Sequence, residues 1–186
     1  MPREIEIKLA VDSVPRTRAL LRRHGFTVTT PRVFEANTLY DTAALALRAQ
    51  RQLLRIRTVG RKYLVTYKGS PLEGPYKSRE EIEFNIGDAN SAALMLLRLG
   101  YHPVFRYEKY RTVFGRPREA GHVTLDETPI GIFLELEGPP AWIDRTARLL
   151  GFPRESYITL SYGSLYLADC QARGVAPANM VFTSMP

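Results

Sequence analysis

The chain has 186 residues and carries 26 Lys and Arg against 19 Asp and Glu, a net charge of +7, with 45% apolar and 24% charged residues. This length and composition are typical of one globular domain with a real core, and they exclude wholesale disorder. No apolar run is long enough to cross a membrane, and the charged N-terminus is not a secretory signal. The single cysteine, Cys170, can form no internal disulfide, which predicts a cytoplasmic protein.

The first half of the chain is predicted to contain four strands and two helices. Residues 4–9 alternate between polar and apolar side chains, which predicts a strand, and a helix is expected over 14–24. The alternation returns at 53–57, 63–68 and 79–84, before a second helix over 88–99. The helices end at Gly25-Phe26 and Gly100-Tyr101, where the glycine supplies a left-handed residue and the aromatic ring can fold back onto the last turn.

The second half continues with strands at 107–114, 122–126 and 132–137, joined by hairpin turns. A third helix, over 141–150, ends at Gly151-Phe152, and a fourth is expected over 164–173. The whole pattern predicts an α+β protein with about seven or eight strands, mostly antiparallel. We expect residues 1–174 to form a single domain and residues 175–186, which show no period, to form a mobile tail.

Each predicted strand has one apolar and one charged face, because side chains at i and i+2 share a face. One explanation is an antiparallel sheet that turns its charged face to water. However, three amphipathic helices need an apolar surface to cover, and each strand offers only one such face. If the helices cover it from outside, a sheet of this many strands curls into a barrel whose charged faces line the lumen. The sequence therefore favours a charged tunnel.

Carboxylate pairs in the first and last strands indicate what such a lumen could bind. Glu4/Glu6 and Glu135/Glu137 supply the oxygen ligands that Mg²⁺ or Mn²⁺ prefers, and Glu81 and Asp126 could add more. Arginine and lysine side chains on the same faces suit phosphate groups. Carboxylates that can bind a metal ion, together with cationic side chains that can bind phosphate groups, favour phosphoryl or nucleotidyl transfer. No P-loop or dinucleotide-binding motif is present, and the three histidines are expected to be structural or solvated.

A series of motifs resembles the CYTH superfamily, the triphosphate tunnel metalloenzymes. That group includes class IV adenylate cyclases, thiamine triphosphatases and tripolyphosphatases. The matching segments agree in order and approximate spacing over residues 4 to 160, and they are Glu4-x-Glu6-x-Lys8, Asn37-Thr38-Leu39-Tyr40-Asp41-Thr42, Leu54-Arg55-Ile56-Arg57, Thr66-Tyr67-Lys68-Gly69, Arg79-x-Glu81-x-Glu83, Lys109-x-Arg111, Leu125-Asp126 and Gly131-Ile132-Phe133-Leu134-Glu135-Leu136-Glu137. One departure is Thr159, which stands where the family commonly has an acid, so no contact is carried over to Arg154 or Ser156.

The resemblance implies a closed, antiparallel, eight-stranded β-barrel with helices outside, and a site for Mg²⁺ or Mn²⁺. The residues that it implies at the site fall into three overlapping sets. The catalytic set is Glu4, Glu6, Lys8 and Lys68. The substrate-binding set is Lys8, Arg55, Arg57, Lys68, Arg79, Lys109 and Arg111. The metal-binding set is Glu4, Glu6, Glu81, Glu83, Asp126, Glu135 and Glu137.

These residues favour a metal-dependent hydrolase acting on a triphosphate such as tripolyphosphate, a nucleoside triphosphate or thiamine triphosphate. A class IV adenylate cyclase, which makes cyclic AMP and pyrophosphate from ATP, is the first alternative, because the tunnel residues suit both reactions. A non-catalytic binder of polyphosphate or nucleotides is the second, although the full set of acids counts against it. We expect the partner to be a triphosphate-containing small molecule and not a nucleic acid or a membrane. The formation of a homodimer is left as an open alternative.

Overall fold

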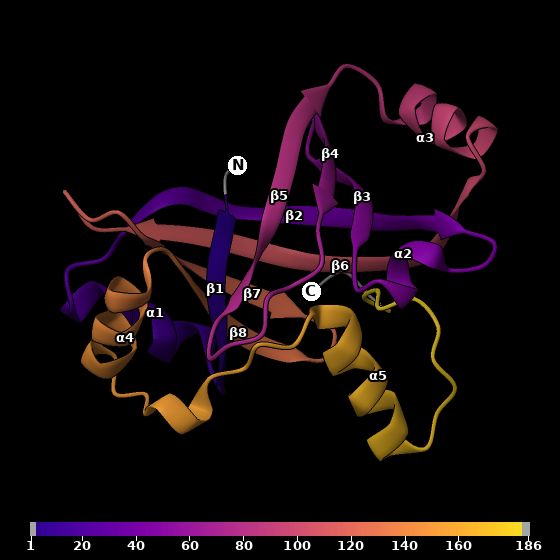
Figure 1. Ribbon diagram of the computed structural model, residues 1–186. Coiled ribbons are helices and arrows are strands. Elements are labelled where there is room, and N and C mark those ends of the chain that lie inside the picture. The colour runs from indigo at the N-terminus through magenta and orange to yellow at the C-terminus, as the bar shows by residue number, and fades with distance from the viewer. Residues whose placement is uncertain (1–2, 184–186) are drawn as a thin grey trace.

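The computed structural model describes residues 3–183, which form an eight-stranded barrel surrounded by helices (Figure 1). Its elements, in chain order, are β1 (Arg3–Val11), α1 (Val14–Arg23), β2 (Thr27–Thr42), α2 (Ala46–Ala49), β3 (Leu53–Val59), β4 (Lys62–Lys68), β5 (Lys77–Ile86), α3 (Ala89–Arg98), β6 (Tyr101–Gly115), β7 (His122–Thr128), β8 (Gly131–Glu137), α4 (Pro140–Leu149), the 3₁₀ turn η1 (Arg154–Ser156) and α5 (Tyr162–Arg173).

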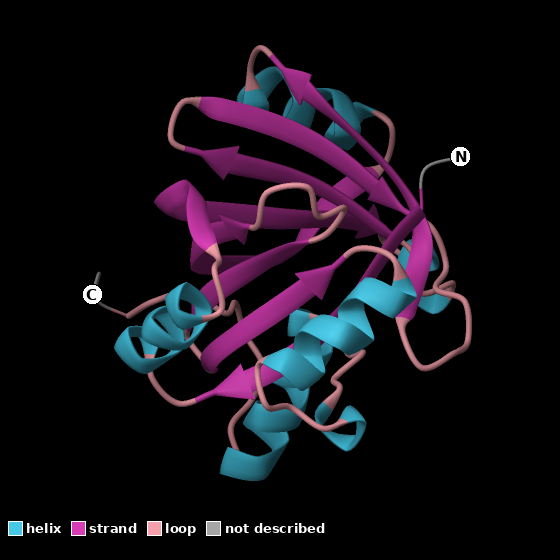
Figure 2. Ribbon diagram, turned by 90° about the vertical axis from the view of Figure 1, so that its left-hand side faces the viewer, coloured by secondary structure: helices cyan, strands magenta, loops and turns pink. Residues whose placement is uncertain are grey.

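The strands close in the order β1-β5-β4-β3-β2-β6-β7-β8, and every neighbouring pair is antiparallel. Figure 2 shows how the strands wrap around a common interior. Closure depends on β1, which pairs with β5 near its start, from Arg3 to Glu6, and with β8 from Glu6 to Val11. The predicted fold class, an α+β protein with a closed antiparallel barrel, is confirmed.

The long strand β2 is the element that the alternation pattern did not predict. Its sequence is polar for much of its length and contains Pro31, which breaks the period and removes a backbone donor. Accordingly, the register of β2 against β6 shifts between Val28 and Thr30 and again between Thr30 and Val33. Tertiary pairing with β3 and β6 makes this segment a strand despite its weak pattern.

The main core lies outside the barrel, between its apolar face and helices α1 and α4. Ile7 of β1 and Leu134 of β8 are fully buried there, together with Leu21 of α1 and Ile143 of α4. Helix α1 ends as predicted at Gly25, whose φ of 79° is left-handed. Because these helices occupy the apolar face, the charged face of each strand is left to the lumen.

The segment after α5, which the sequence predicts to be a mobile tail, lies against strand β6 in the structure. Met180 is fully buried and forms a parallel bridge with Tyr107 of β6. Its N–H donates to the carbonyl of Arg106, and its carbonyl accepts from the N–H of Glu108, both at 2.9 Å. The segment is therefore held against the barrel by one buried side chain and two backbone hydrogen bonds, which its lack of periodicity concealed. Residues 184–186 of the predicted tail lie outside the described residues.

Helix α3 covers a smaller apolar cluster on the far side of the barrel from α1 and α4 (Figure 1). Leu96 is its buried residue, whereas Leu94 and Met95 remain exposed. None of the helices in residues 3–183 has the length and hydropathy needed to cross a membrane.

Candidate active site

The lumen of the barrel is filled with charged side chains. The residues lining its cavity, of about 90 Å³, include Glu4, Glu6, Lys8, Arg55, Arg57, Lys68, Lys77, Arg79, Lys109, Arg111 and Glu135. All the predicted substrate-binding and catalytic residues are among them. The free volume is small because acidic and basic side chains meet across the lumen.

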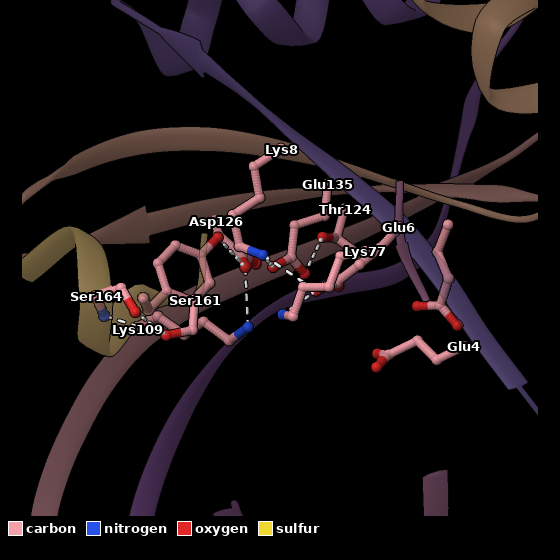
Figure 3. Close-up of polar contacts among 12 residues, drawn as sticks. Glu4, Glu6, Lys8, Lys77, Lys109, Thr124, Asp126, Glu135, Ser161 and Ser164 are labelled. Carbon is pink, nitrogen blue, oxygen red and sulfur yellow. Dashed lines mark hydrogen bonds and ion pairs between the residues drawn. The ribbon is translucent and has the colours of Figure 1, made fainter. Parts of the chain in front are cut away.

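Beside β1, two carboxylates and two ammonium groups form a chain of ion pairs (Figure 3). The Nζ of Lys8 lies 3.2 Å from both Glu6 and Glu135, and the Nζ of Lys77 lies 2.5 Å from Glu6. Burial alone would raise the pKa of Glu6, but the charges of Lys8 and Lys77 hold that pKa far below its usual value. Burial and the nearby charges of Lys8 and Arg79 lower the pKa of Lys77 to about 8, although Glu6 opposes this.

A second group of charges joins β1, β4 and β5. The Nζ of Lys68 donates to both carboxylate oxygens of Glu4, at 2.5 and 2.6 Å, and lies 3.1 Å from Glu81. Burial raises the pKa of Glu81, and the carboxylate of Glu4 adds to this effect. Arg79 is 3.7 Å from Glu4. Lys68 is thus shared by two predicted metal ligands.

Asp126 of β7 is fully buried and surrounded by donors. It accepts hydrogen bonds from the Nζ of Lys109 at 2.8 Å, the Nε of Arg111 at 2.7 Å and the hydroxyl of Tyr162 at 2.8 Å. Arg111 also pairs with Glu135. These contacts fix the direction of the Lys109 and Arg111 side chains.

The opposite wall holds the two arginines of β3. Arg55 donates to the hydroxyl of Tyr107 at 3.0 Å and to Glu83 at 3.2 Å. The Nε of Arg57 donates to the Oδ1 of Asn37 at 3.0 Å. Burial would raise the pKa of the Tyr107 hydroxyl, but the charge of Arg55 and other nearby cations lowers it to about 8.

Several lumen residues were not among those predicted from the sequence. Lys77 lies two residues before Arg79 in β5, and extending the alternation back by one pair of residues would have included it. Glu35 and Asn37 lie on β2, where the pattern was too weak to define a face. Tyr107 of β6 has an aromatic ring, which an alternation pattern counts as core, and Tyr162 lies on α5, outside the strands.

Three buried polar atoms of lumen residues have no hydrogen-bond partner within the described part of the chain. The Nδ2 of Asn37 and the Nε of Arg79 are donors, whereas the Oε2 of Glu35 is an acceptor, with the cations of Arg57 and Lys109 each 3.7 Å away. Buried donors without partners are rare, because each has lost its hydration. Their presence on the lumen indicates that the site is built for an acceptor-rich ligand.

Glu137 differs from the other lumen carboxylates. Its side chain is 34% exposed, and the Nε2 of His122 lies 3.4 Å from its carboxylate. Burial and the nearby charges of Glu4, Glu6 and Glu135 raise the pKa of Glu137 to about 7. The raised pKa of Glu137 shows that the neighbouring lysines do not fully neutralise this group of carboxylates.

The donor set at this crowded point fits a hard divalent cation. Among residues 3–183, no three acidic, histidine or cysteine side chains form a ready-made metal cluster. Glu4, Glu6 and Glu135 each form an ion pair with a lysine instead. Glu137 faces these three carboxylates with a raised pKa, and a cation with oxygen ligands would relieve that repulsion. The residues present therefore suit Mg²⁺ or Mn²⁺.

Two groups of residues named in the sequence analysis lie away from the charged lumen. Asp41 accepts hydrogen bonds from the backbone N–H groups of Leu47 and Arg48, so it holds the short helix α2. Arg154 and Ser156 lie on η1, where Ser156 donates to the carbonyl of Pro153 at 2.6 Å.

Comparison with known proteins identifies the family. The CYTH domain matches residues 2–159, from the start of β1 to just before α5. A protein of Methanocaldococcus jannaschii, provisionally named an adenylate cyclase, is 30% identical over 135 residues, which are 72% of this chain and 75% of the relative.

Solved structures share the fold at lower identity. A Vibrio parahaemolyticus protein, provisionally described as an adenylate cyclase, has a TM-score of 0.75 and 22% identity over 87% of this chain and 96% of its own. A Pyrococcus horikoshii protein has a TM-score of 0.74 and 24% identity, covering 89% and 99%. A Hippeastrum protein, provisionally named an adenylyl cyclase and described as having a dominant triphosphatase activity, has a TM-score of 0.65 and 21% identity, covering 91% and 96%. At these identities the likeness concerns the fold alone.

Proposed function

Because the chain belongs to the CYTH domain family, we propose that it is a divalent-metal-dependent phosphohydrolase that binds a triphosphate in the lumen of its barrel. The observation that carries this proposal is the meeting of opposite charges in one enclosed space. Carboxylates that suit a metal and cations that suit phosphates line the same cavity, together with two buried donors that lack partners. A polyanionic ligand would satisfy those donors and the cations around them.

The metal would be held by the carboxylates of Glu4, Glu6, Glu135 and Glu137, and Glu81 is a further candidate. When bound, a Mg²⁺ or Mn²⁺ ion would neutralise charge on the phosphate oxygens and favour attack on phosphorus. We assign Asp126 and Glu83 a different task. Asp126 orients Lys109 and Arg111, and Glu83 orients Arg55, since each carboxylate already accepts hydrogen bonds from these cations.

The cationic side chains would bind and orient the phosphates. Arg55, Arg57 and Arg111 offer planar guanidinium groups, which can donate two hydrogen bonds to one phosphate. Lys8 and Lys68 are now paired with glutamates, and a phosphate and a metal entering together would replace those partners with others of matching charge. Positioning and charge neutralisation of this kind account for most of the catalysis in phosphoryl transfer.

The test is a panel of substrates with product analysis. Tripolyphosphate, ATP and thiamine triphosphate are incubated with the protein and Mg²⁺ or Mn²⁺, and with EDTA as the control. We expect phosphate to be released with either metal and release to stop with EDTA. Full activity in excess EDTA would overturn the metal assignment, and no turnover of any substrate would overturn the proposal of an enzyme.

A class IV adenylate cyclase is the second candidate, favoured by the name of the M. jannaschii relative. Hydrolysis attacks the terminal phosphorus with water, whereas cyclisation attacks the α-phosphorus with the 3′-hydroxyl of the ribose. The products of ATP separate the two reactions. ADP and phosphate support the hydrolase, and cyclic AMP with pyrophosphate would make the protein a cyclase with the same phosphate and metal site.

A further inference from the structure

Tyr162, the first residue of α5, lines the lumen although it belongs to no strand. It is more than nine-tenths buried, and it lies beyond residue 159, where the CYTH match ends. Ser161 is the N-cap of α5, and its Oγ accepts a hydrogen bond from the N–H of Ser164 at 3.1 Å. Figure 3 shows these two serines at the start of the helix, close to the charged side chains of the lumen. The cap therefore fixes the point at which the Tyr162 side chain leaves the helix.

The chain just before α5 is bonded to β1 at Lys8. Strand β5 pairs with β1 only as far as Glu6, so it leaves the edge of β1 at Lys8 uncovered. Ile158 occupies this edge. The N–H of Lys8 donates to the carbonyl of Ile158 at 2.8 Å, and the N–H of Ile158 donates to the carbonyl of Lys8 at 2.9 Å. These two hydrogen bonds bring the start of α5, and with it Tyr162, beside the side chain of Lys8.

The ring of Tyr162 is shared by two lysines of the lumen. The Nζ of Lys8 lies 5.1 Å from the ring centroid, and the Nζ of Lys109 lies 5.2 Å from it. Both distances are within the reach of a cation–π interaction, which is strongest where the cation has lost its water, and both lysines are almost fully buried. An aromatic ring attracts an ammonium group through its quadrupole and carries no net charge. Unlike a carboxylate, it can hold a lysine without neutralising it.

The hydroxyl of Tyr162 fixes the orientation of that ring. It donates to the Oδ2 of Asp126 at 2.8 Å, and the Nζ of Lys109 donates to the same oxygen at 2.8 Å. Burial and the charge of Asp126 raise the pKa of Tyr162 well above its usual value. The hydroxyl therefore stays protonated and acts as a hydrogen-bond donor to the carboxylate, which holds the ring beside the two ammonium groups.

We propose that Tyr162 is a positioning residue of the phosphate site, whose ring holds Lys8 and Lys109 in place and leaves their positive charges available to phosphate. The inference rests on the proposed function, since it assumes that these two lysines bind the phosphates. The effect of Tyr162 passes through the lysines, because the ring and hydroxyl are already engaged with them and with Asp126. The start of α5 thereby contributes to phosphate binding, although the barrel supplies the cations.

The test changes the ring of Tyr162 in steps and uses inorganic tripolyphosphate as the probe. Tyr162→Phe removes the hydroxyl and keeps the ring, and Tyr162→Leu removes the ring. Position 162 is also filled with phenylalanines that carry one, two or three ring fluorines, which weaken the negative face of the ring with little change in its size.

Affinity is measured by isothermal titration calorimetry in EDTA, and KM and kcat are measured with Mg²⁺. The matched controls are Tyr157→Phe and Tyr157→Leu. The hydroxyl of Tyr157 also donates to an aspartate, Asp144, at 3.1 Å, but Tyr157 does not line the lumen cavity. Circular dichroism and melting temperature verify that each variant is folded.

We expect Tyr162→Phe to weaken binding by less than about threefold, because the ring remains. Each added fluorine should weaken binding further, and Tyr162→Leu should bind tripolyphosphate about tenfold more weakly than the wild type. KM should rise along the same series by more than kcat falls, since the lysines bind the substrate before it reacts. The Tyr157 variants should lower the melting temperature without changing the affinity.

A purely structural role of Tyr162 would give a different result. An affinity and a KM that do not change along the fluorine series, or that change equally in the Tyr157 variants, would overturn the inference and leave the proposed function standing. If the wild type neither binds tripolyphosphate in EDTA nor hydrolyses it with Mg²⁺, the proposed function itself is overturned for this substrate, and the inference with it.

Discussion

Replacing Glu137 by glutamine should stabilise the folded protein above neutral pH. The folded state holds a proton on this carboxyl up to a pKa of about 7, because burial and the carboxylates of Glu4, Glu6 and Glu135 disfavour its charge. The unfolded chain releases that proton near the ordinary pKa of 4.5. Between these two values the folded state binds more protons than the unfolded state, so stability falls as pH rises. The loss of folding stability caused by Glu137 is absent below the pKa of the unfolded chain and complete above the pKa of the folded protein.

The two pKa values limit the size of the effect. At about 1.4 kcal/mol per pH unit, the difference between 4.5 and about 7 corresponds to at most about 3.5 kcal/mol. The Glu137 side chain is 34% exposed, and solvent screening reduces the expected gain to about 1–2 kcal/mol. A glutamine at this position carries no charge, so the variant escapes the penalty at any pH.

The assay is urea unfolding followed by the fluorescence of Trp142, the one tryptophan of the chain. Wild type and Glu137→Gln are compared from pH 5 to pH 8 in EDTA, with Glu155→Gln, an exposed glutamate on η1, as the matched control. Because the imidazole of His122 lies 3.4 Å from Glu137, the comparison is repeated with His122→Gln introduced into both the wild type and the Glu137→Gln variant. A stability difference that does not grow between pH 5 and pH 8 would refute the crowding of carboxylates. With Mg²⁺ added, we expect the wild type to gain more stability than the variant.

The remaining predictions concern other parts of the barrel. Glu6→Gln should have the opposite effect to Glu137→Gln and lower the free energy of unfolding by about 3 kcal/mol at pH 7, because it leaves two buried lysines with less compensation; an unchanged urea midpoint would contradict this. Gly121→Ala should destabilise by about 2 kcal/mol in the same assay, since its Cβ would lie 2.4 Å from the Trp142 ring, and a neutral result would mean that the ring can move. Met180→Ala should cost about 3 kcal/mol, because this side chain is fully buried; a cost near zero would favour the mobile tail that the sequence predicts. Arg57→Ala should reduce the rise in melting temperature that tripolyphosphate produces, and a shift equal to that of the wild type would place Arg57 away from the ligand.

The sequence by itself determined which side of each strand is charged. An alternation such as that of Glu4, Glu6 and Lys8 assigns side chains to faces because successive residues of a strand point to opposite sides. The three helices with apolar faces then required an apolar surface outside the sheet, and the core around Ile7 and Ile143 confirms that arrangement. The ends of the helices could also be predicted from local sequence, since Gly25 adopts the left-handed conformation predicted for it.

The tertiary structure alone decided which charges meet. Alternation says nothing about register, which depends on long-range pairing, and register sets Glu6 opposite both Lys77 and Glu137 on its two sides. For this reason the opposite pKa shifts of Glu6 and Glu137 could not be predicted from their common motif position.

Elements with weak local patterns were likewise decided by tertiary contacts. Strand β2, interrupted by Pro31, is a strand because β3 and β6 pair with it. The segment around Met180 contacts the barrel through one buried side chain and backbone hydrogen bonds to β6. A cavity beside the tunnel exists because α5 and this segment fold back against the barrel, so its walls join residues that are more than a hundred positions apart, such as Leu53 and Leu167. A local pattern records only the neighbours of a residue along the chain, whereas such a wall depends on neighbours in space.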